Sequence, residues 1–185
     1  MRTIALLTLA ALFPATAIPS GSMSSSPPDG TPPTIGFAGA KGPAWISIEY
    51  PVNPHDATTR NAFLLVHAFH HGTPMAFPVS GTAEGIVNGE RRSVRLDFTR
   101  TSRNGVYALA RQWPVEGTWT LAIAVSQGKD SRAWAIVELA RSGEVAAVRV
   151  PTRRQDQWTI PTDVAMSEID AGLRARAAQV ARAPR

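Results

Sequence analysis

Hydrophobic and polar side chains alternate along much of the chain between residues 44 and 150, and the clearest alternation lies in residues 105–125. In the second half of this stretch, one face of an extended strand carries large apolar side chains, and the other carries Thr and Ala. The large apolar side chains are those of Trp119, Leu121, Ile123 and Val125. A period of two predicts β-strands rather than a helix. Because Pro114 and Gly117 interrupt the pattern, we predict a β-hairpin at 105–125, around which the other strands assemble.

Other segments of the same kind predict an all-β domain. Residues 62–71 are apolar on both faces for most of their length, as in a strand buried between two layers. Shorter strands are predicted at residues 44–50, 86–87, 93–99, 133–139 and 145–150. Residues 75–79 are predicted to be an edge strand or an extended loop, because Pro74 and Pro78 are poorly suited to a central strand, and residues 80–85 are predicted to be turn-like. About eight short strands separated by turn residues favour an immunoglobulin-like β-sandwich, which we place at about residues 44–150.

The last part of the chain, residues 151–185, changes character. Residues 151–161 are predicted to be extended, with Trp158 and Ile160 available to pin this segment to the domain. A capping pattern from Ser167, followed by apolar residues at helical spacing, predicts an α-helix at about residues 167–182. We expect the helix to pack on the sandwich or to fray in solvent. A partner-binding or membrane-surface helix is the alternative, although its apolar stripe is narrow.

The first 17 residues have the order of a secretory signal: an early Arg2, an apolar run to residue 13, and Ala15-Thr16-Ala17. The run of about ten apolar residues is half of what a bilayer span needs. We therefore predict cleavage after Ala17, with a retained N-terminal anchor as the alternative, and no membrane span after cleavage. Residues 18–43 are rich in Pro, Gly and Ser and predict a disordered linker. These features predict a periplasmic or secreted protein.

Composition narrows the classes of function further. The chain has no cysteine, which excludes disulfides, thiolate metal sites and attachment through an N-terminal lipid-modified thiol. The formal net charge is +5, but no basic run is interleaved with aromatic side chains, so we expect no nucleic-acid binding.

The string Gly105-x-Tyr107, followed by Gly117-x-Trp119-x-Leu121, resembles small exported immunoglobulin-like domains of the YtkA, FixH and CopC kind. The resemblance implies structural roles for Tyr107, as a corner residue, and for Trp119. Some of these families are linked to copper handling or to oxidase assembly. The CopC family carries a copper-ligating His at its mature N-terminus, whereas cleavage after Ala17 would leave Ile18 there, so family ligands do not carry over.

Possible metal ligands gather in one segment that contains His67, His70, His71 and Met75. Imidazole and thioether donors suit copper, and imidazoles alone suit zinc. In a straight strand, His67 and His71 would lie about 13 Å apart, and His70 would point to the opposite face. One ion could be shared only if the chain turns after His71.

Such a turn would bring His70 or His71 toward Met75, or another segment could supply His55 or Glu84 as a further ligand. The alternative, which we favour, is that His67 is a hydrogen-bonded core residue and that the pair at 70 and 71 sits at an exposed strand end. Metal binding by His70, His71 and Met75 is therefore kept as a second hypothesis.

The sequence contains none of the common catalytic motifs. The chain has no Gly-x-Ser-x-Gly elbow, no His-Glu-x-x-His helix and no phosphate-cradling loop. We therefore expect no catalytic residues and no cofactor, with a hydrolase of unrecognised type as a third reading. Arg91, Arg92 and Arg95 could form a cationic patch for an acidic partner, although a solubilising hairpin tip is favoured.

The function that we predict is a non-catalytic accessory or binding module of the cell envelope, which acts through protein surfaces on an envelope protein. The alternative is a periplasmic copper- or zinc-binding protein.

Overall fold

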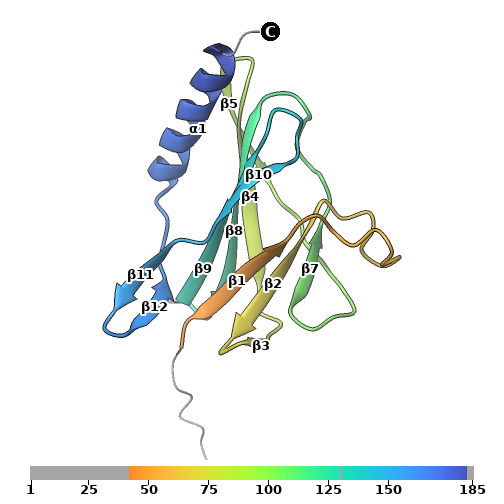
Figure 1. Ribbon diagram of the computed structural model, residues 1–185, viewed down its shortest axis with the longest axis vertical. Helices are drawn as coiled ribbons and strands as arrows, with labels where there is room; N and C mark the ends of the chain where they lie inside the picture. Colours follow the sequence, from red (N-terminus) through yellow and green to blue (C-terminus); the bar gives the residue numbers. More distant parts are fainter. Residues whose placement is uncertain (1–41, 130, 183–185) are drawn as a thin grey trace, which may run out of the picture. The chain divides into compact units, whose positions relative to one another are not determined.

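A computed structural model describes residues 42–129 and 131–182 (Figure 1), all of which belong to one compact unit. The predicted signal peptide at 1–17, and nearly all of the predicted linker at 18–43, lie outside the described residues. The described chain is mostly β, with one C-terminal helix. Within it, no helix has the length and hydrophobicity needed to cross a membrane.

The first of two five-stranded antiparallel sheets has the order β1-β2-β7-β6, with β3 also paired to β2. Its strands are β1 (Ala44–Glu49), β2 (Leu64–His70), β3 (Thr73–Pro74), β6 (Thr99–Arg100) and β7 (Val106–Leu109). As the apolar pattern of residues 62–71 predicted, β2 is central, and Leu64, Leu65 and Val66 are fully buried.

The second five-stranded sheet has the order β10-β9-β8-β4-β5, so β10 and β5 are its two edges. Its strands are β4 (Val79–Val87), β5 (Glu90–Arg95), β8 (Thr118–Gln127), β9 (Ser131–Leu139) and β10 (Val145–Arg149). One buried hydrophobic cluster contains side chains from both sheets, including Leu64 and Leu109 from the first and Leu121 and Val137 from the second.

The predicted hairpin at residues 105–125 is wrong. Its two halves are strands of different sheets, since β7 pairs with β2 and β6, whereas β8 pairs with β4 and β9. The segment between them contains Trp113, which is only 4% exposed. Each strand has one strongly apolar face, and placing the strands in separate sheets lets both faces contribute to the same core. Alternation predicted the strands and their buried faces, but it carried no information about which strand lies beside which.

Residues 80–85 were predicted to be turn-like, and this is also wrong, because they lie within the nine-residue strand β4. The glycines that suggested a turn serve close packing instead. Gly85 is opposite Trp119 of β8, and a side chain at Gly85 would collide with the Trp119 ring. Glycine here allows a large aromatic ring to lie directly on the neighbouring strand.

The segment predicted to be extended, residues 151–161, forms a separate two-stranded hairpin of β11 (Thr152–Gln155) and β12 (Trp158–Pro161). In Figure 1 this hairpin stands at the lower left, beside the lower end of β9. The helix α1 (Met166–Arg182) lies close to its predicted position and contacts β8 and β4. Ile169 of the helix packs on Ala122 and Ile136, on the side of the second sheet opposite the main core.

The two aromatic residues with predicted structural roles are both buried. Tyr107 is 5% exposed, and its hydroxyl donates a hydrogen bond to the carbonyl oxygen of Phe77 at 2.5 Å. Trp119 is 2% exposed, and its indole N–H donates to the carbonyl oxygen of Glu116 at 2.8 Å.

Candidate functional site

The turn that a metal site would need after His71 is present. His71 and Gly72 both have positive φ, at 50° and 77°, and they form the two-residue loop between β2 and β3. The rings of His70 and His71 lie 4.3 Å apart between centroids. His70 Nε2 lies 3.1 Å from the carbonyl oxygen of Gly42, so in neutral His70 this nitrogen carries the proton and Nδ1 keeps its lone pair.

Of the other residues suggested as ligands, Met75 lies beside β2, whereas Glu84 and His55 lie in other parts of the fold. Met75 is 37% exposed, and its backbone N–H donates to the carbonyl oxygen of Ala68. Glu84 is occupied by other partners, as described below, and His55 lies in the polar connection between β1 and β2. Within residues 42–129 and 131–182, no group of three or more His, Cys, Asp or Glu side chains could hold a metal ion. The structure thus brings two imidazoles together without a third ligand of these types.

His67 is hydrogen-bonded, as we favoured from the sequence, but it is half-buried rather than a core residue. Its Nε2 lies 2.9 Å from the Glu49 carboxylate, and Arg103 approaches the same carboxylate at 3.7 Å. Ser47 is directly opposite His67 in the strand register. Among the described residues, however, no hydrogen bond joins Ser47 to His67. Ser47, His67 and Glu49 therefore do not form a catalytic triad, because the contact between nucleophile and base that acyl transfer requires is missing.

Arg91, the first residue of the predicted cationic patch, is used within the fold. Its guanidinium lies 2.6 Å from Glu84, whose side chain is 3% exposed, and 2.5 Å from Asp170 of α1. Burial alone would lower the pKa of Arg91, but the hydrogen bonds that Arg91 donates to Glu84 and Asp170 and the negative charges of these two residues outweigh it and raise that pKa above its usual value. Arg92 is paired with Glu90. The patch is therefore largely neutralised, and its main contribution is to hold the helix on the sheet.

A row of polar side chains crosses the second sheet beneath α1. In the strand register Ser93, Glu84, Thr120 and Glu138 are successive neighbours on β5, β4, β8 and β9. Arg176 of α1 reaches this row, donating hydrogen bonds to Thr120 Oγ1 and to the carbonyl oxygens of Trp119 and Leu139. Helix docking thus combines a small apolar contact with charged hydrogen bonds.

A pocket of about 190 Å³ adjoins this arginine, between the second half of α1 and the end of the sheet where β9 turns into β10. Its apolar lining comes from Leu139, Ala140, Ala146 and Val180. Arg176 lines the same pocket, and burial lowers its pKa. Its Nε–H makes no hydrogen bond to any described residue, although the Glu138 carboxylate lies 3.6 Å away. The pocket therefore has an apolar wall beside a buried arginine whose charge is paired with that of Glu138.

The edge strand β10 begins at this pocket and exposes a row of small apolar side chains. Four of its five residues are Val or Ala, and every residue after Val145 is exposed, with Val148 at 43%. The pairing with β9 shifts register between Val145 and Ala147, which indicates a β-bulge. An edge strand presents unpaired backbone groups on its outer side. Edge and pocket together form what we call the β10 edge site.

Sequence reasoning did not find this site. The Val-Ala-Ala-Val run predicted a strand correctly, but nothing in the run shows that it lies at an edge rather than in the centre of a sheet. The Arg176 contacts join residues more than 30 positions apart in the chain, which no local pattern encodes.

A comparison of the chain with protein-family models, with curated proteins and with solved structures finds no match. The resemblance to the YtkA, FixH and CopC kind thus stays a prediction from the sequence.

Proposed function

We propose that this protein is a non-catalytic, exported binding module of the cell envelope, built as an immunoglobulin-like β-sandwich, that recruits a partner protein at the β10 edge site. The partner would add an extended segment to β10 as a further strand. In this mode of recognition, backbone hydrogen bonds supply affinity, and pockets for side chains supply specificity.

The observation that carries the proposal is the coincidence of an exposed apolar edge strand with a pocket at its start. Ala146 belongs to both the strand and the pocket lining. An extended segment paired along β10 could place one apolar side chain into the pocket, against the apolar wall that lies beside Arg176.

The sandwich type is supported by three features. Two five-stranded antiparallel sheets contribute to one buried cluster. The Tyr107 hydroxyl bonds to a backbone carbonyl, as that of a corner tyrosine does, although the acceptor lies 30 residues earlier rather than a few residues upstream. Leu109, two residues after that tyrosine, is fully buried. Export is supported by the order of charge, apolar run and small residues at positions 1–17.

Site-specific photo-crosslinking in the cells that produce the protein tests the proposal. A photo-reactive amino acid is placed at Ala147 of β10 or, as the matched control, at Arg92 of β5, which is also exposed on an edge strand. We expect one dominant protein adduct from position 147 and none from position 92. The adduct should disappear when Val148→Lys is added, because a charge on the edge opposes strand addition. Equal adducts from both positions, or adducts insensitive to Val148→Lys, would refute the β10 edge site.

A second candidate function is the binding of a copper or zinc ion by His70 and His71, with Met75 as a soft third donor. The observation that favours it is the 4.3 Å separation of the two imidazole rings at a tight turn. A free Nδ1 lone pair on His70 is the donor that such an ion needs.

Thermal unfolding with Cu(I), Cu(II) and Zn(II) distinguishes this candidate. An ion held at a hundred times its dissociation constant stabilises the folded state by about 2.7 kcal/mol, which raises the midpoint by several degrees. The rise should vanish when His70, His71 and Met75 are all changed to Ala, and persist in the control His55→Ala. No rise with any ion would end the metal hypothesis and leave the binding module untouched.

A further inference from the structure

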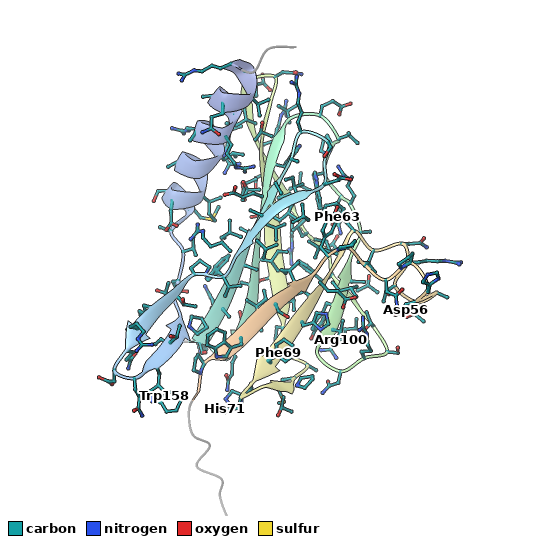
Figure 2. All side chains as sticks on the ribbon, in the orientation of Figure 1. Asp56, Phe63, Phe69, His71, Arg100 and Trp158 are labelled. Carbon is teal, nitrogen blue, oxygen red and sulfur yellow. The ribbon has the colours of Figure 1, made fainter. Side chains whose placement is uncertain are left out.

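The β11–β12 hairpin has an unusual surface for so small an element. All of its residues from Thr152 to Thr159 are exposed, and Trp158 at 65% is the most exposed of the large apolar side chains that the structure describes. Trp158 is paired with Gln155 directly beside the two-residue turn at Asp156 and Gln157. Figure 2 shows Trp158 at the lower end of the view, at the outer margin of the ribbon. The hairpin thus presents an indole near its tip.

The same hairpin carries positive charge that the fold does not use. Arg153 and Arg154 are exposed, and neither forms an ion pair with any residue that the structure describes. Asp156 at the turn is the hairpin's one acidic residue, which leaves a net charge of +1 from two arginines and one aspartate.

Further positive charge lies next to the base of the hairpin. Trp134 of β9 donates a hydrogen bond to Asp163, just beyond the end of β12, so this part of β9 adjoins the base. Arg132 shares a face of β9 with Trp134, is exposed, and has no ion pair among the described residues. Two arginines thus lie on the same hairpin as the indole, and a third lies near the base of that hairpin.

We propose that this hairpin is a membrane-surface contact, in which Trp158 enters the headgroup region of an anionic bilayer and Arg153, Arg154 and Arg132 bind lipid phosphates. Tryptophan favours the interface between water and hydrocarbon because its ring is apolar while its N–H can still donate a hydrogen bond. Arginines near an anionic surface add attraction that salt screens. The contact lies on a hairpin outside the β10 edge site and does not depend on it.

The shape of the hairpin favours a lipid surface over a protein partner. The pocket beside α1 and a second pocket around Arg100 and Tyr107 include no residue of β11 or β12, and every hairpin residue from Thr152 to Thr159 is exposed. A bilayer surface deforms around an inserted side chain and needs no complementary pocket on either side. The formal charge of the whole chain, +5, favours the same anionic surface.

Vesicle binding tests the proposal with the protein as its producing cells process it. Co-sedimentation is measured with vesicles of phosphatidylcholine alone and with about 30% phosphatidylglycerol, where the surface potential attracts basic segments. We expect binding only to the anionic vesicles, weakened about fivefold by Arg153→Ala or Arg154→Ala and about tenfold by Trp158→Ala. The control Arg95→Ala removes another exposed, unpaired arginine from β5 and should leave binding unchanged. All variants share one N-terminus, so differences between them report the hairpin.

Tryptophan fluorescence shows whether Trp158 itself enters the lipid. Trp113 and Trp119 are buried at 4% and 2% exposed, so lipid-borne quenchers should reach Trp158 first. Brominated anionic lipid should quench the wild-type emission, and Trp158→Phe should remove that quenching while retaining part of the binding. Unchanged thermal midpoints would show that the variants are folded.

Three results would overturn the membrane contact. They are absence of binding to anionic vesicles, equal binding of the wild type and the Trp158→Ala variant, and a loss in Arg95→Ala as large as in the hairpin variants. In the first case the exposed indole would be left for a protein partner to cover.

Discussion

The two edge strands of the second sheet, β5 and β10, differ in their charge. In β5, four of the six residues are charged, and Arg91 ties the strand to both Glu84 and the helix. In β10, one of the five residues is charged, and Arg149 makes a single exposed ion pair with Glu168 of the same helix. Each edge strand thus forms an ion pair between one of its arginines and α1, but only in β5 do further charged residues stand beside that arginine.

Charge on an edge strand opposes pairing with another chain, and an apolar edge invites it. The difference therefore shows which edge of the sheet is open to a partner. One feature of β10 opposes pairing with another strand. Its β-bulge disturbs the regular spacing of backbone groups, but for only part of the strand. The comparison leads to four predictions, which follow from the largest expected effect to the smallest.

Arg91→Ala should destabilise the fold most. It leaves the Glu84 carboxylate, 3% exposed, with Ser93 as its hydrogen-bond donor and removes the link to Asp170. Breaking a fully buried pair costs roughly 3–5 kcal/mol, but Arg91 is itself 35% exposed, so we expect about 2 kcal/mol in urea unfolding. Arg92→Ala is the control, because its pair with Glu90 is exposed. Equal effects of the two variants would contradict the internal role of Arg91.

Arg176→Met should have an intermediate effect. It keeps an apolar stem against the sheet but removes the hydrogen bonds to Thr120 and to the carbonyl oxygens of Trp119 and Leu139. We expect a loss of about 1 kcal/mol in urea unfolding, with faster amide hydrogen exchange along α1. Stability equal to the wild type would show that desolvation of this arginine offsets its bonds.

Arg149→Ala should cost less than about 0.5 kcal/mol, because both partners of its ion pair are about half exposed, at 51% and 55%. The same unfolding experiment measures it. A loss comparable to that of Arg91→Ala would mean that the two edges hold the helix equally, and the contrast drawn above would fail.

Changing the charge of the two edge strands should change self-association of the protein slightly. Replacing Arg92 and Arg95 with Thr lowers the charge of β5, and we expect a few-fold stronger self-association in sedimentation velocity. Val148→Lys should shift association in the opposite direction, with stability unchanged within about 0.5 kcal/mol. If neither variant alters sedimentation, edge charge does not control pairing in this sheet.

Much of the local structure was predictable from short-range patterns. The alternation of Trp119, Leu121, Ile123 and Val125 identified a buried strand face, and the capping pattern at Ser167 placed the helix to within one residue of its observed start. The histidine segment was only partly predictable. Its turn was anticipated as a condition for metal binding. The partners of the histidines were not, because His67 bonds to Glu49 of β1, and His70 bonds to Gly42, which precedes β1.

By itself, the sequence determined most of the strands, their buried faces and the position of the helix, because period and capping depend on neighbours within a few residues. The tertiary structure alone decided that β7 and β8 belong to different sheets, that β10 is an open edge, and that Arg91 and Arg176 hold the helix. Each of these outcomes depends on pairings between distant segments. Several arrangements bury the same apolar faces, and only the packed chain selects one of them.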